Sequence, residues 1–178
     1  MTVMKKITTK TLWIGIATTV IVLAVAIVGV KVFYAPKDTI NIGDVEIKSP
    51  MGNKAVKIGS TQTAVISALG QPKQIAAYSS QASYKQGTVL NYNGAKFYFV
   101  HDKLTNFEIT SHKFKVDLAG ARKYITSIGN SPSDLPRLKI QDNTAFLDVK
   151  NEDAIADQYL EYDLGGDGKV TKILYSDY

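Results

Sequence analysis

Four acidic side chains gather within residues 148–157 and are the first candidates for chemistry in this sequence: Asp148, Glu152, Asp153 and Asp157. Neighbouring carboxylates can share a proton, as the acid and base of a hydrolase do, or they can bind a hard cation. The residues around them, KNEDAIAD, are polar and typical of an exposed turn that leads into a strand. A solvated surface is therefore the preferred interpretation, and a hydrolase that uses the acidic cluster is the less favoured alternative.

A glycine-rich segment, DLGGDG at residues 163–168, and the two histidines, His101 and His112, are further candidates. The segment lacks the D-x-[DN]-x-[DN]-G spacing and the later glutamate of a calcium loop, so its glycines indicate a turn with positive φ. A histidine can serve as a base or a ligand, but neither a nucleophile motif nor a third ligand accompanies these two. We therefore predict no catalytic residue, no metal site and no cofactor.

Tyrosines are the remaining residues with a potential role in recognition. A tyrosine offers a large, stiff contact area to a partner, although it is also a common strand residue. Tyr98 and Tyr162 are the preferred binding residues, because each is expected to point away from the core residues of its strand. The wider set contains Tyr78, Tyr84, Tyr92, Tyr98, Tyr159, Tyr162, Tyr175 and Tyr178.

An uncharged stretch at residues 11–30 comes before all of these candidates. About 20 such residues in a helix cross the roughly 30 Å hydrocarbon core of a membrane. Three lysines within residues 1–10 favour a cytoplasmic N-terminus. A cleaved signal peptide is disfavoured because the apolar run is long and bulky residues stand where small ones are needed. We predict a cytoplasmic basic tail at 1–10, a transmembrane signal anchor at 11–35 and an extracytoplasmic C-terminal domain.

The charges are unevenly spread along the chain. The formal net charge is +5, but four of the 21 basic residues precede residue 36 and all 16 acidic residues follow it. The extracytoplasmic part is therefore nearly neutral, which gives no case for binding nucleic acid. Within it, residues 36–115 carry a positive surplus and residues 116–178 a negative one, which can steer a partner. The absence of cysteine excludes disulfides, thiol catalysis and a lipid-modified cysteine anchor.

Local signals predict a short helix followed by a β-meander. Thr61 can cap the start of the helix, Gly70 can take the left-handed position at its end, and Pro72 prevents continuation. Asn93-Gly94 then predicts a two-residue hairpin turn between strands. Residues 36–56, ahead of the helix, are predicted to form a linker with one or two short strands.

The pattern then recurs in the second half of the chain. The tripeptide IGN at residues 128–130 matches IGS at residues 58–60, and the strands that follow match with similar spacing. We predict an α+β fold of two tandem helix-plus-antiparallel-meander repeats, 57–115 and 116–178. The two repeats are expected to share one sheet with their helices on one face, because a single repeat buries too little apolar surface to be stable alone.

The pattern G-x-[ST]-x-x-x-V-x-x-x-L-G-x-P, followed by a meander, resembles that of the small lipoprotein of the outer-membrane β-barrel assembly machine. It is made here by Gly59, Thr61, Val65, Leu69, Gly70 and Pro72. Its doubled form resembles the tandem-repeat fold of β-lactamase inhibitor protein. The resemblance covers roughly residues 57–178, and this chain differs from the lipoprotein in lacking a lipid-accepting cysteine. Members of this superfamily mostly bind other proteins, so the resemblance implies a binding module.

The sequence therefore predicts a membrane-anchored, extracytoplasmic, non-catalytic protein-binding module of the bacterial cell envelope. Its partners are expected to be another envelope protein or a peptide, and the membrane through residues 11–35. An ion-responsive or small-ligand sensory anchor is the alternative function.

Overall fold

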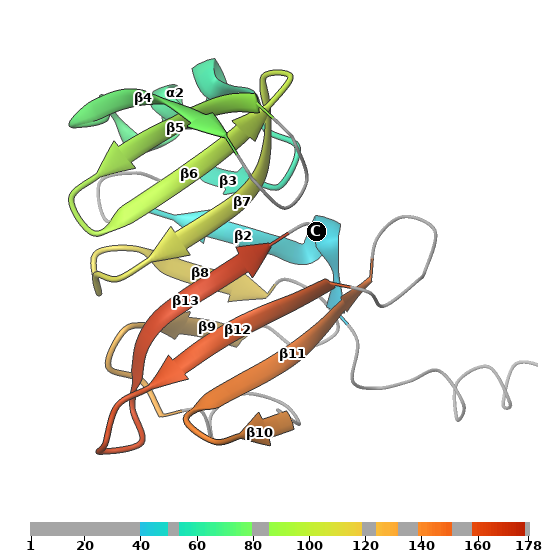
Figure 1. Ribbon diagram of the computed structural model, residues 1–178, viewed down its shortest axis with the longest axis vertical. Helices are drawn as coiled ribbons and strands as arrows, with labels where there is room; N and C mark the ends of the chain where they lie inside the picture. The colour runs from blue at the N-terminus through green and yellow to red at the C-terminus, as the bar shows by residue number, and fades with distance from the viewer. Residues whose placement is uncertain are drawn as a thin grey trace, which may run out of the picture. The chain divides into compact units, whose positions relative to one another are not determined.

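The computed structural model describes residues 40–49, 54–79, 86–118, 124–131, 139–150 and 158–176. This part is mostly β structure with one short α-helix (Figure 1). The elements of its first half are β1 (Ile40–Asn41), η1 (Ile42–Asp44), β2 (Val45–Lys48), β3 (Ala55–Lys57), α2 (Gln62–Leu69), β4 (Gln74–Ser79), β5 (Gln86–Tyr92), β6 (Ala95–Val100) and β7 (Lys103–Ile109). Those of its second half are β8 (Lys115–Leu118), β9 (Tyr124–Ser127), β10 (Lys139–Gln141), β11 (Thr144–Lys150), β12 (Gln158–Leu164) and β13 (Val170–Ser176).

The predicted anchor at residues 11–35 and the basic tail before it lie outside the described residues. No helix within the described ranges is long and apolar enough to cross a membrane.

The helix α2 begins and ends where the sequence predicts. The Thr61 hydroxyl accepts a hydrogen bond from the Ala64 N–H at 3.2 Å, which satisfies one of the free donors of the first turn. At the other end Gly70 has φ +85° and donates its N–H to the Ile66 carbonyl at 2.9 Å. The buried residues Val65 and Leu69 attach one face of the helix to the core.

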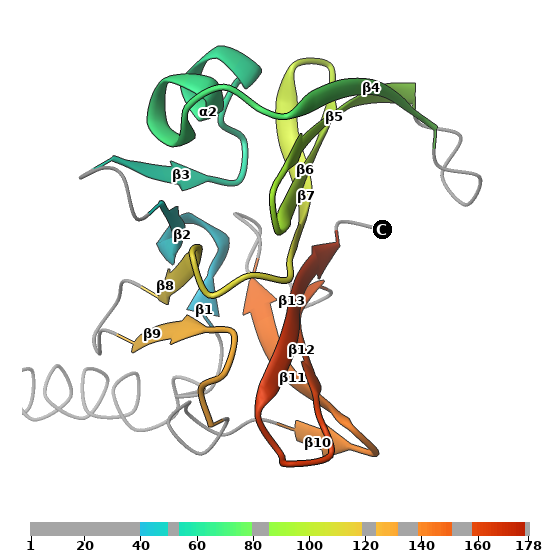
Figure 2. The ribbon, with the colours of Figure 1, turned by 90° about the vertical axis from the view of Figure 1, so that its left-hand side faces the viewer.

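The strands form two sheets. The larger has nine strands in the order β1-β11-β12-β13-β7-β6-β5-β4, with β10 also paired to β11, and the smaller has the order β3-β2-β8-β9. The two predicted meanders therefore share a sheet, joined by the antiparallel pairing of β7 with β13. The smaller sheet was not predicted, and it lies with α2 on one side of the larger sheet (Figure 2).

The turns that carry the repeated tripeptide make the same contacts in both halves. The Gly59 N–H donates to the Leu104 carbonyl and the Gly129 N–H donates to the Val170 carbonyl, both at 2.8 Å. In return, the N–H groups of Leu104 and Val170 donate to the carbonyl of the residue after each glycine, at 2.9 and 3.0 Å. Both glycines have positive φ, +83° and +90°, which side chains with a Cβ adopt at a cost.

Equivalent strands also pair with each other around an approximate two-fold axis. Leu104 corresponds to Val170, so Phe107 corresponds to Ile173 and Ile109 to Tyr175. The observed pairs are Phe107 with Tyr175 and Ile109 with Ile173. A two-fold rotation that exchanges the two repeats converts each of these pairs into the other. In the smaller sheet the central antiparallel pair, β2 with β8, is flanked by β3 and β9 in the same way. The predicted second helix falls mostly on residues 132–138, outside the described part, and stays a prediction.

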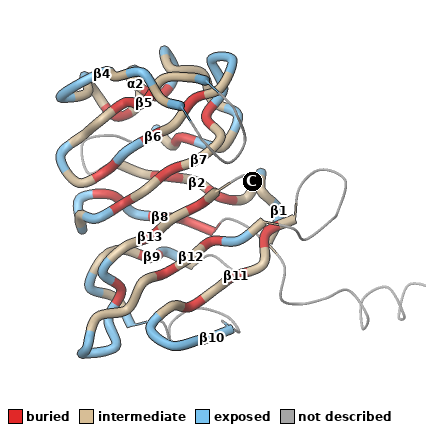
Figure 3. Tube along the Cα trace, in the orientation of Figure 1, coloured by how far each residue is buried: buried red, intermediate tan, exposed pale blue. Residues whose placement is uncertain are grey.

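The core lies between the two sheets and under α2, as the distribution of buried residues shows (Figure 3). Leu69, Phe97, Phe99 and Phe107 were predicted to be buried, and each is at most 6% exposed. The lysines of the two equivalent turns, Lys103 and Lys169, are exposed as predicted.

Candidate binding surface

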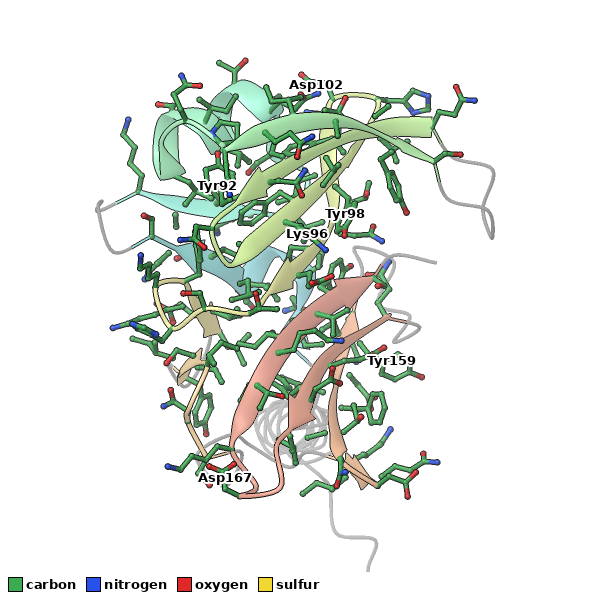
Figure 4. All side chains as sticks on the ribbon, turned by 60° about the vertical axis from the view of Figure 1, so that its left-hand side comes forward. Tyr92, Lys96, Tyr98, Asp102, Tyr159 and Asp167 are labelled. Carbon is green, nitrogen blue, oxygen red and sulfur yellow. The ribbon has the colours of Figure 1, made fainter. Side chains whose placement is uncertain are left out.

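The face of the nine-stranded sheet that points away from the smaller sheet is the candidate surface, and we call it the outer face. On β6, Phe97 and Phe99 point inward and are buried, whereas Lys96 and Tyr98 point outward. In Figure 2 the smaller sheet and α2 lie on the inner side, and no described element lies on the outer side. Figure 4 shows Tyr98 and Tyr159 on one side of the large sheet and Tyr92 on the other. The outer face is thus a sheet surface without a covering layer in the described part.

A pair of tyrosines stands at one end of the outer face. The rings of Tyr78 on β4 and Tyr98 on β6 have centroids 5.0 Å apart, tilted by 60°, and both residues are half-buried. Gly87 on β5 lies opposite Tyr78 and between the two strands, so no side chain separates the rings. A Cβ at Gly87 would stand only 1.8 Å from the Phe99 carbonyl oxygen, so the strands could not approach as they do. The glycine therefore makes room for the aromatic pair.

The Tyr98 hydroxyl stays protonated well beyond neutral pH. Burial raises its pKa, and the Glu108 carboxylate and Tyr78 raise it further. Glu108 lies opposite Lys96 on the neighbouring strand, with the ion-pair atoms 3.5 Å apart. A protonated phenol next to a carboxylate and an ammonium offers a partner a hydrogen-bond donor, an anion and a cation beside the rings.

A second aromatic pair stands near the opposite end of the outer face. Phe146 on β11 and Tyr159 on β12 meet edge to face with centroids 6.3 Å apart, and Tyr159 is 37% exposed. An ion pair lies beside it, because Asp148 stands opposite Tyr159 and is 2.8 Å from Lys139. Ion pairs between strands leave small net charge, so this part of the surface is amphipathic.

The prediction that Tyr162 is an exposed counterpart of Tyr98 is wrong. Tyr162 is fully buried, since it pairs with Ile173 and points inward. The true counterpart of Tyr98 is Asp163, because both residues stand at a register shift. The Tyr98 carbonyl accepts a hydrogen bond from the Thr105 hydroxyl at 3.3 Å, and the Asp163 carbonyl accepts one from the Thr171 hydroxyl at 3.1 Å. Side chains alternate between faces, so an error of one residue in the alignment reverses the predicted direction.

The Tyr162 hydroxyl is itself unusual. It and Thr126 Oγ1 are buried without a well-formed hydrogen bond in the described part of the chain. Burial raises the pKa of Tyr162 strongly, and the nearby Thr126 hydroxyl offsets only part of that rise. This residue is a structural part of the core rather than a part of the surface.

The other sequence candidates are not brought together by the described structure. Asp148 points outward and is paired with Lys139, while Glu152, Asp153 and Asp157 lie outside the described residues. His101 and His112 are both exposed. Across the described ranges, no three histidine or acidic side chains are grouped closely enough to hold a metal ion.

The DLGGDG segment is a turn. The Gly165 N–H donates to the Lys169 carbonyl at 2.8 Å, and Gly168 has φ +73°. One acidic side chain is engaged in an ion pair, Asp163 to Lys172 at 2.6 Å. The other, Asp167, accepts a hydrogen bond from the Lys169 N–H at 3.1 Å, so this bond stabilises the turn itself.

The sequence interpretation named Tyr78 and Tyr159 only in the wider set of tyrosines, without preferring them as binding residues, and it did not name Phe146. Residues 74–79 were not predicted as a strand, because QIAAYS shows only weak alternation of apolar and polar residues. Phe146 stands on a strand with apolar residues on both faces, so its direction was not visible in the pattern.

Comparison with known proteins identifies no family for this chain. No family model matches the chain, and no curated protein matches it. One solved structure with similarity is an extracellular protein containing a SCP domain from Bacillus anthracis str. Ames, at 13% identity and a TM-score of 0.37. The match covers 67% of this chain and 44% of that one, so the chain spans less than half of that protein's length. A similarity of this size establishes neither a shared fold nor a shared function.

Proposed function

We propose that this chain is a membrane-anchored, extracytoplasmic, non-catalytic module that binds another protein of the bacterial cell envelope, or a peptide of one, on the outer face. The anchor is assigned to residues 11–35 because residues 11–30 carry no charge and are long enough to cross a membrane as a helix. Two helix-plus-meander repeats, 57–115 and 116–178, would supply the halves of the binding sheet.

The observation that carries the proposal is the outer face, which no described element covers, with its Tyr78–Tyr98 pair. Large amphipathic side chains on a rigid sheet lose little conformational entropy when a partner binds. The flanking Lys96–Glu108 pair adds charges of both signs beside the rings. Such a surface suits a protein partner with an apolar centre and a polar rim.

A capture experiment with the full-length chain tests the proposal. The tagged chain is extracted from its native membranes after brief cross-linking, and proteins retained by it are compared with those retained by Tyr98→Ala. We expect a specific partner to be retained at least about 10-fold less by the variant, since truncation of an aromatic anchor residue costs about 2 kcal/mol or more in many interfaces. A matched control is Tyr175→Phe, which changes a buried tyrosine on the inner face. Equal retention by all three proteins would overturn the proposed site.

A further inference from the structure

The strand β4 forms one edge of the nine-stranded sheet and lacks the usual protection of an edge. Its sequence is QIAAYS, without charge or proline, and its six residue pairs with β5 run without a register shift. Within the described residues, β4 pairs with no strand other than β5. Natural sheets guard such edges with charges, prolines or bulges, because free N–H and C=O groups recruit further strands.

The opposite edge of the same sheet is guarded. β10, the counterpart of β4, is three residues long and carries Lys139, which is 2.8 Å from Asp148. The remaining part of that edge is paired with the two-residue strand β1. β4 and β10 are equivalent edge strands, but only β10 is short and charged. The long, uncharged edge of β4 is therefore a property of the first repeat and does not follow from the fold alone.

The free hydrogen-bonding groups of β4 can be identified from the neighbouring hairpin. The two-residue turn Asn93-Gly94 makes Tyr92 and Ala95 a hydrogen-bonded pair, and such pairs alternate along an antiparallel ladder. It follows that Ile75, Ala77 and Ser79 direct their N–H and C=O groups away from β5. All three residues are exposed, and Ile75 retains 56% of its surface although it is a large apolar side chain.

We propose that β4 of a second copy of this chain pairs antiparallel with β4, which joins two sheets into one. The strand is complementary to itself, since a two-fold axis at Ala76 or Ala77 places only uncharged side chains opposite each other. Small alanines at the axis allow close approach, and the second copy covers Ile75 with Ala77 or Ser79. Equivalent strands already associate in this manner inside the chain, where β7 pairs antiparallel with β13 around the internal axis.

The pairing would enlarge the proposed binding surface. A two-fold axis perpendicular to the sheet keeps both outer faces on the same side, with Tyr78 of each copy next to the axis. A strand contact alone buries less than the 1,200–2,000 Å² of a typical stable interface, so we expect it to be weak in dilute solution. Confinement of both copies to one membrane raises their effective concentration, a point that rests on the proposed anchor.

Cysteine trapping tests the inference cleanly, because the 178-residue chain contains no cysteine. Ala76→Cys and Ala77→Cys variants are oxidised briefly in native membranes and separated without reductant. Opposed residues of an antiparallel pair have Cα atoms about 4.5 or 5.5 Å apart, within reach of a disulfide. We expect one of the two variants to form a covalent dimer at least about 10-fold faster than Ile140→Cys, which is 61% exposed on the guarded edge.

A blocking substitution separates specific pairing from random collision. Ile75→Lys adds a charge at an exposed position of β4, so in the cross-linking background it should reduce dimer formation at least fivefold. Equal cross-linking at positions 76, 77 and 140, no cross-linking at 76 or 77, or no effect of Ile75→Lys would each overturn the inference. Capture of a partner through Tyr98 is measured in parallel with Ile75→Lys alone, so loss of dimerisation and loss of partner binding are distinguishable.

Discussion

Lys48 on β2 forms an ion pair with Asp117 on β8, and the two residues occupy equivalent places in the two halves of the smaller sheet. Ile47 and Val116 lie opposite each other where the approximate two-fold axis passes between β2 and β8. The rotation about this axis therefore brings Lys48, the residue after Ile47, to the place of Asp117, the residue after Val116. The Asp117 side chain is only 1% exposed, and one of its oxygens has no hydrogen-bond partner in the described structure. A nearly buried carboxylate of one half is therefore compensated by an ammonium of the other.

Lys48→Met should destabilise the fold, because it leaves the Asp117 charge buried without its partner. We expect a loss of about 1–3 kcal/mol, between the values for exposed and fully buried pairs. The Lys48 side chain is 35% exposed, which places it between these limits. Denaturant unfolding of the full-length chain in detergent, followed by circular dichroism, measures the change. Lys57→Met is the control, since it breaks an exposed pair with Glu46, and an equal loss in both variants would contradict the prediction.

Gly87→Ala should also destabilise the fold and open the outer face. The new Cβ would stand 1.8 Å from the Phe99 carbonyl oxygen, so β5 and β6 would have to separate locally. We expect a cost of about 1–3 kcal/mol, as for other overpacked sites. Thermal unfolding compares it with Gly43→Ala, where nothing lies within 4 Å of the added Cβ. Similar unfolding temperatures for these two variants would count against the close approach of the strands.

Features encoded by neighbouring residues could be predicted from the sequence. The helix α2 follows from Thr61 and Gly70, and the hairpin after it follows from Asn93-Gly94, because caps and turns depend on a few adjacent positions. The shared sheet followed from the repeated tripeptide and its spacing. Caps and turns are determined by adjacent residues, and the repeat is visible because the same residues recur at a similar spacing.

Long-range pairing and exact register could not be predicted. The smaller sheet joins Val45 to Leu118, and its strands have only three or four residues, too few to show a pattern. The direction of Tyr162 was predicted wrongly because β12 carries aromatic side chains on both faces, with Tyr159 exposed and Tyr162 buried beside Leu160, so its sequence does not show which face points to the core. The place of Tyr78 on the candidate surface depends on β4, whose pattern is weak.

Gly59 and Gly129 provide a test of the repeat itself. Both have positive φ and nothing within 4 Å of an added Cβ, so alanine there is opposed by backbone conformation alone. We expect each substitution to cost about 1–2 kcal/mol, with similar values because the turns make the same hydrogen bonds. Denaturant unfolding of the single variants measures both, and Gly166→Ala, without positive φ, is the control. A cost at one glycine alone would show that the two turns are not energetically equivalent.

High pH should weaken the fold through its buried tyrosines. Burial raises the pKa of Tyr92 to about 12, and it raises the pKa of Tyr162 further. A raised pKa in the folded state means that this stability is complete below the ordinary tyrosine pKa near 10 and is lost as pH rises through the folded value. We therefore expect the free energy of unfolding to be steady from pH 8 to 10 and to fall between pH 10 and 12.

Tyr92→Phe separates this effect from general alkaline damage. At pH 8 the variant should lose about 1 kcal/mol, because the Tyr92 hydroxyl no longer donates to the Gly70 carbonyl; that bond is 2.9 Å long. Above pH 10 it should lose less stability per pH unit than the unmodified chain, since one group that must be kept protonated is gone. Tyr159→Phe, at an exposed position, should leave the slope unchanged. The same slope in all three proteins would mean that Tyr92 does not contribute to alkaline unfolding.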